Sequence, residues 1–208
     1  MIHISLANTK LDGSRIGIAP IPSINLPPVK TCRPDAPCKG TCYACKGLFN
    51  MGRNRKILED NWEYYWNHPV DYFKEIRKAC VTAKLFRWHS AGDIPSSWYL
   101  WNMVKIAEEI PDTKFLCFTK QYETVNKYLM RFDKLPSNLI VVFSAWGDYD
   151  FPNPHNLPVA YVRLKSGEGS DKIPADARKC TGYCAECILG ESNCWNLKHG
   201  ESVVFNEH

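Results

Sequence analysis

Two groups of cysteines constrain this chain more than any other feature. Ten of its 208 residues are cysteine, and eight of them stand in two short segments: Cys32, Cys38, Cys42 and Cys45, then Cys180, Cys184, Cys187 and Cys194. Each group contains a C-x3-C-x2-C spacing, which lets three thiolates face one centre from a single loop. The remaining two, Cys80 and Cys117, stand alone in apolar surroundings, and we expect them in the core.

The cysteines also indicate a compartment. Their share is below that of a small secreted disulfide scaffold, and the N-terminus carries no basic segment followed by an apolar run. We therefore expect a cytoplasmic protein with reduced thiols, in which the eight grouped cysteines are metal or cluster ligands. Either a [4Fe-4S] cluster, one or two per chain, or zinc satisfies the donor set, and zinc is a strong alternative at the C-terminal group.

The overall composition is that of a folded chain. Hydrophobic residues make up 45% and charged residues 23%, and no apolar run is long enough to cross a membrane. The formal net charge of +4 does not favour nucleic acid as a partner, although it does not exclude it. Residues 1–170, which include the first cysteine loop, are expected to form one domain. The cysteine-rich residues 171–208 are expected to pack on the same edge of that domain as this loop. The sequence leaves the oligomeric state open.

Short apolar runs alternate with segments of helical period along the chain. Strands are predicted at residues 15–21, 85–89, 114–118, 139–144 and 159–164, and helices over 54–66, from Pro69, from Ser96 or Ser97, and from Tyr122 to Phe132. This alternation predicts an α/β fold, either a partial (incomplete) β/α barrel or an open, mostly parallel sheet. In both architectures the loops that follow the strands carry the site.

Polar residues stand where several predicted strands end. The types needed for acid–base chemistry are His89, Ser90, Asp93 and Lys120, which we predict to be catalytic. Residues expected to line the bound substrate or cofactor are Gly92, Thr119 and Ser144. The alternative is that these groups bond to loop backbone or cap helices.

Two resemblances follow from these residues. The Cys38, Cys42 and Cys45 spacing after the first strand resembles the radical S-adenosylmethionine enzymes, in which three cysteines hold a [4Fe-4S] cluster and one iron is left open for S-adenosylmethionine. A fourth thiolate, Cys32, could close that position. Over roughly residues 24 to 194 the chain resembles the gene product eighty-eight family of phages and bacteria. The segments that carry this second resemblance are Leu26-Pro27, Thr31-Cys32, Cys42-Tyr43-Ala44, Arg87 to Asp93, Phe118-Thr119-Lys120 and the C-terminal cysteines. It implies a phage protein in the cytoplasm of an infected or host bacterial cell.

The leading functional hypothesis is an iron-sulfur enzyme derived from a radical-SAM-like scaffold, acting on a small molecule or another unknown substrate. A second hypothesis is a cluster-stabilised hydrolase or lyase that uses His89 and Asp93 without radical chemistry. A third is a binding module for nucleic acid or protein that a structural zinc ion or cluster stabilises.

Overall fold

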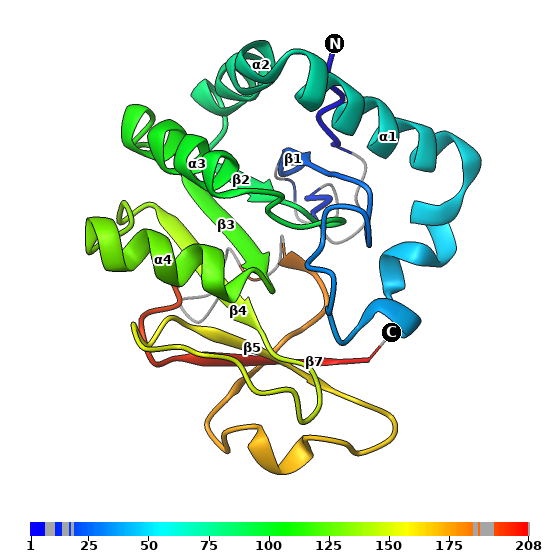
Figure 1. Ribbon diagram of the computed structural model, residues 1–208, viewed down its shortest axis with the longest axis vertical. Helices are drawn as coiled ribbons and strands as arrows, with labels where there is room; N and C mark the ends of the chain where they lie inside the picture. Colours follow the sequence, from blue (N-terminus) through cyan, green and yellow to red (C-terminus); the bar gives the residue numbers. More distant parts are fainter. Residues whose placement is uncertain (7–10, 14–16, 18, 185–186, 188–193, 208) are drawn as a thin grey trace.

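The computed structural model describes residues 1–6, 11–13, 17, 19–184, 187 and 194–207. Its described part contains one open sheet of seven strands (Figure 1). The strands are β1 (Ser23–Ile24), β2 (Leu85–Trp88), β3 (Lys114–Thr119), β4 (Leu139–Ser144), β5 (Val159–Arg163), β6 (Arg178–Lys179) and β7 (Ser202–Asn206). Every neighbouring pair is parallel, in the order β1-β2-β3-β4-β5-β7-β6.

Four α-helices connect the first strands. They are α1 (Gly52–Asn67), α2 (Pro69–Val81), α3 (Ser97–Glu109) and α4 (Tyr122–Phe132). Pro69 occupies the first turn of α2, where its missing N–H is not needed. Ser96 caps α3, and its Oγ accepts from the backbone N–H of Tyr99 at 3.1 Å. Short 3-10 turns occur at Lys39–Thr41, Tyr43–Cys45, Gly47–Asn50, Ser170–Lys172 and Cys194–Asn196.

The strand order places these helices on one face. From β1 to β5 each strand lies next to its predecessor, so successive right-handed crossovers all fall on the same side of the sheet. Figure 1 shows the four helices gathered there. Phe86 and Trp88 of β2 and Phe115 of β3 point to this helical face and are completely buried.

The opposite side, which we call the inner face, has its own apolar cluster. Leu116, Val142, Ala160 and Val203 contribute from the strands, and no residue of the four helices joins them. Buried side chains from both ends of the described chain cover it, namely Leu11, Ile21, Trp195 and Leu197. Cys180, Cys184 and Cys194 pack against this cluster.

The predicted α/β class is confirmed, in its open parallel form; the described residues show no pairing between β1 and β6 that would close a barrel. The first predicted strand is displaced. Residues 14–16 and 18 lie outside the described part, and parallel pairing begins at Ser23, because Pro20 and Pro22 cannot donate to a ladder. Within the described residues, no helix has the length and apolar character to cross a bilayer.

Candidate functional site

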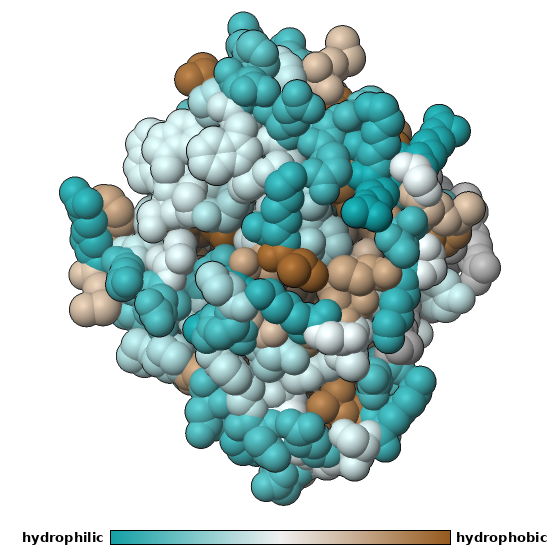
Figure 2. All heavy atoms as spheres, turned by 45° about the vertical axis from the view of Figure 1, so that its right-hand side comes forward, coloured by the Kyte–Doolittle hydropathy of each residue, from teal (hydrophilic) through white to brown (hydrophobic). Residues whose placement is uncertain are grey.

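The first cysteine group lies in the loop between β1 and α1, whose 3-10 turns bend the chain at Lys39–Thr41 and Tyr43–Cys45. Cys32, Cys38 and Cys42 are half-buried and Cys45 is exposed. Figure 2, turned toward the side that carries α1 and these turns, shows apolar side chains gathered near the middle of the face with hydrophilic ones around them.

The thiols of this group lie close enough to affect one another. The pKa of Cys32 is raised to about 12, first by burial and then by the charges of Asp93, Cys38 and Cys42. Burial also raises the pKa of Cys38; Lys120 opposes that shift, and Cys42 adds to it. Thiols that raise one another's pKa would repel as thiolates, and a bound cation would relieve that repulsion.

The second cysteine group is gathered in the same way. The pKa of Cys194 is raised to about 12, first by burial and then by the charges of Cys184 and Cys180. The backbone N–H of Gly182 donates to Cys180 Sγ at 3.3 Å. Cys187 is described and Cys180 directly follows β6, whereas residues 185–186 and 188–193 between these cysteines are outside the described part.

Neither cysteine group has the geometry of a complete metal site. Among the residues that the structure describes, no three His, Cys, Asp or Glu side chains are placed so that they could hold a metal ion as they stand. The donor chemistry of both groups nevertheless fits a soft metal or an iron-sulfur cluster, and such sites commonly tighten when the metal binds.

Asp93 is the centre of a buried polar network at the carboxyl ends of β2 and β3. Its Oδ1 accepts from Thr119 Oγ1 at 2.6 Å and from the backbone N–H of Ile94 at 2.7 Å. Its Oδ2 accepts from the backbone N–H of Lys120 at 2.9 Å. Burial raises the pKa of Asp93, while these donors and the charge of Lys120 lower it.

Lys120 extends the network to the next strand. Its Nζ donates to Ser144 Oγ, at the end of β4, at 2.8 Å, and lies 5.5 Å from the ring centroid of Trp146. Lys120 makes no ion pair among the described residues. The structure thus joins Asp93, Thr119, Lys120 and Ser144, which stand at or just after the ends of β2, β3 and β4, in one network.

Gly92 permits a close backbone approach in the same loop. Its φ is +81°, and a Cβ there would lie 2.6 Å from the carbonyl oxygen of Leu26 and 2.8 Å from Thr31 Oγ1. Only glycine suits such a position. Ser90 is buried, and its backbone N–H donates to Asn25 Oδ1 at 2.7 Å.

His89 stands apart from this network. It is buried, and its Nε2 lies 3.0 Å from the hydroxyl of Tyr99 on α3. Burial, with a contribution from Arg87, lowers the pKa of His89 to about 3. An imidazole with this pKa stays neutral at physiological pH, and no hydrogen bond between His89 and Asp93 occurs in the described structure.

Two of the segments that carry the family resemblance also touch. The hydroxyl of Tyr43, in the first cysteine loop, donates to the carbonyl oxygen of Ser90. A sequence model of the gene product 88 family matches residues 4–197. The chain belongs to the gene product 88 family. A relative, the gene 88 protein of Mycobacterium phage L5, is 29% identical over 190 residues, covering 82% of this chain and 77% of the relative. No solved structure matches the chain, and neither comparison supports the resemblance to radical S-adenosylmethionine enzymes.

In this gene product 88 protein, two supporting residues escaped the sequence analysis. Asn25 Oδ1 accepts from the backbone N–H groups of Ser90 and Ala91, at 2.7 and 3.1 Å. Thr31 Oγ1 accepts from the backbone N–H of Asp93 at 3.1 Å. Thr31 precedes Cys32 and Asn25 precedes Leu-Pro, but nothing in the sequence alone connects either with a loop more than 60 residues away.

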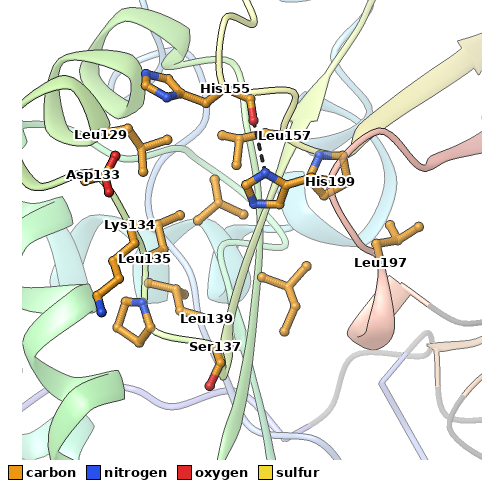
Figure 3. A pocket seen from close by; sticks show the side chains of 14 residues that line it. Leu129, Asp133, Lys134, Leu135, Ser137, Leu139, His155, Leu157, Leu197 and His199 are labelled. Atoms are coloured by element: carbon orange, nitrogen blue, oxygen red, sulfur yellow. Dashed lines mark hydrogen bonds between the residues drawn. The ribbon is translucent and has the colours of Figure 1, made fainter.

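A separate cavity of about 390 Å³ lies at the opposite ends of the strands (Figure 3). Its walls include Ser137, Leu157 and His199, which precede β4, β5 and β7. The ring of His199 bonds through Nδ1 to the carbonyl oxygen of His155 at 3.0 Å. None of the residues predicted to form the site lines this cavity.

Proposed function

We propose that this protein is an iron-sulfur protein in which Cys38, Cys42 and Cys45, with Cys32 nearby, hold a [4Fe-4S] cluster. The observation that carries the proposal is that three half-buried thiols of the loop after β1, Cys32, Cys38 and Cys42, lie near one another and near Asp93 at the carboxyl ends of a parallel sheet. Thiolates are the ligands that iron-sulfur clusters require. A bound cluster supplies one-electron transfer or, at an open iron, Lewis acidity.

We further propose that the protein is an enzyme whose substrate meets the network of Asp93, Lys120 and Ser144. Loops at this end of a parallel sheet are where such folds bind ligands. Lys120 would place a positive charge beside the substrate, and Asp93 holds the Lys120 backbone through its N–H. The neutral, helix-facing His89 suits a structural role better, which favours this version over a hydrolase built on His89 and Asp93. The cysteine spacing supports S-adenosylmethionine as a further cofactor.

The first test is the content of iron, zinc and acid-labile sulfide in protein purified without air. About four iron and four sulfide per chain, or twice that if the second group also holds a cluster, is expected. Zinc without sulfide would overturn the proposal. Added S-adenosylmethionine should then change the EPR spectrum of the reduced cluster. An unchanged spectrum would exclude S-adenosylmethionine as a cofactor but would leave the iron-sulfur cluster in place.

Matched cysteine variants assign each cluster. Cys42→Ser should remove the iron and sulfide of the first group, and Cys187→Ser should remove any held by the second. Cys80→Ser is the control, because Cys80 is buried among apolar side chains of the helical face. Equal iron loss in all three variants would contradict the assignment.

A further inference from the structure

Arg87 is a cation on the inner face of the sheet. It lies between Phe86 and Trp88, which point to the helical face, so the alternation along β2 directs Arg87 to the other side. In register it stands opposite Ser23 of β1 and Leu116 of β3. It is half-buried and therefore still reachable from solvent.

The guanidinium has contacts but no negative partner. Its Cζ lies 4.1 Å from the ring centroid of Phe118, and its Nε donates to the carbonyl oxygen of Trp88 at 3.2 Å. The ring of Phe205 packs edge-on against Phe118, 5.6 Å between centroids, and extends this aromatic wall. Within the described part of the chain Arg87 makes no ion pair, and both of its Nη groups lack hydrogen bonds.

Arg87 lies on the same face of the sheet as the second cysteine group, because Phe118, beside Arg87, packs against the same apolar cluster as Cys180, Cys184 and Cys194. The Nη atoms of Arg87 keep contact with solvent, so an anion can reach this half-buried guanidinium. Its two free Nη groups form a planar fork that matches the oxygens of a carboxylate or phosphate.

We propose that Arg87 binds an oxyanion, the carboxylate or phosphate group of the substrate, while Phe118 and Phe205 contact the adjoining apolar part. The inference rests on the proposed function in that the bound anion belongs to the substrate of the iron-sulfur enzyme. It extends that function by naming an anionic substrate class.

Calorimetric titration of the anaerobically purified full chain with inorganic phosphate and, separately, with acetate tests the proposal. Saturable binding of at least one anion is expected for the wild type. Arg87→Gln should weaken it by about 10-fold or more, because a charge-assisted pair of hydrogen bonds is lost. Arg87→Lys keeps the charge without the planar fork, so its anion affinity should lie between those of the wild type and Arg87→Gln. Arg163→Gln, an exposed arginine at the end of β5, is the control.

Iron and sulfide measured on the same samples separate this inference from the proposed function. Unchanged iron in Arg87→Gln together with lost anion binding supports it. Loss of iron in Arg87→Gln would instead make Arg87 a charge partner of the clusters and would overturn the anion site. Equal anion binding in Arg87→Gln and wild type would overturn the anion site as well. If the wild type holds no cluster but binds the anion through Arg87, the anion site stands and the proposed function falls.

Discussion

Burial of His89 should make the stability of this protein depend on pH. Burial lowers the pKa of His89 from the ordinary 6.5 to about 3. As the pH falls, the unfolded chain therefore takes up a proton at this residue before the folded chain does. The stabilisation is fully present above about pH 6.5 and is lost progressively toward pH 3. Each pH unit in that window removes about 1.4 kcal/mol, which amounts to about 2 kcal/mol by about pH 5.

Urea unfolding of wild type and His89→Asn, at about pH 7.5 and about pH 5, measures this term. With a typical denaturant slope of about 2 kcal/mol per molar, the wild-type midpoint should fall by about 1 M more than that of the variant. Asparagine is chosen because His89 has a φ of +52°, a conformation that asparagine tolerates, and because it does not titrate.

The exposed His68, at the end of α1, provides the control, and His68→Asn should keep the full wild-type fall. Other groups that titrate contribute equally to both proteins, so only the difference between them is assigned to His89. The reasoning is refuted if His89→Asn loses as much stability between the two pH values as the wild type does.

Three further predictions concern the frame of the site and the fold. Gly92→Ala should lose about 1–3 kcal/mol of unfolding free energy in urea, since its Cβ would lie 2.6 Å from a backbone oxygen at a φ of +81°. Gly52→Ala, where a Cβ meets nothing within 4 Å, should not. Asp93→Asn replaces one acceptor of a carboxylate that receives three donors, and should cost about 1–3 kcal/mol in the same assay. The exposed Asp112→Asn should be neutral, and an equal cost in both would contradict this reading. Asn138 Nδ2 faces three backbone carbonyl oxygens at 2.9, 3.1 and 2.9 Å. Asn138→Asp would set a negative charge against them, so its melting temperature should fall by at least about 2 °C, and an unchanged value would exclude a role for this amide.

The sequence was most informative where one local rule decides the structure. The strands predicted near residues 85, 114, 139 and 159 are confirmed, because each is a short apolar run bounded by turn residues. The predicted helix starts at Pro69 and after Ser96 are confirmed, because proline in the first turn and a serine cap each act within a single turn of the helix. The two strands after residue 164 were not predicted. β6 has only two residues, and β7 is a short apolar run near the end of the described chain.

The site could be predicted only as far as strand order implies neighbours. Asp93, Lys120 and Ser144 follow β2, β3 and β4, so adjacency of those strands was enough to bring them together. His89 shows where this rule fails. It follows β2 as well, but the direction of its side chain depends on a positive φ and on Tyr99 from the next helix, neither of which a strand-end rule contains.

The position of the second cysteine group follows from the order of the last three strands. The chain goes from β6, at the edge, back to β7, which lies between β5 and β6. Because β6 and β7 are parallel, the connection must return from one end of the sheet to the other. It also moves in the direction opposite to the steps from β1 to β5. A right-handed crossover in the reversed direction falls on the opposite face from the helices.

The burial of Trp195 and Leu197 in the apolar cluster of the inner face agrees with this path. So does the hydrogen bond, 2.6 Å long, from Lys114 Nζ at the start of β3 to Asn196 Oδ1. Connection handedness, rather than any preference of the cysteines themselves, therefore puts this group on the inner face, toward Arg87.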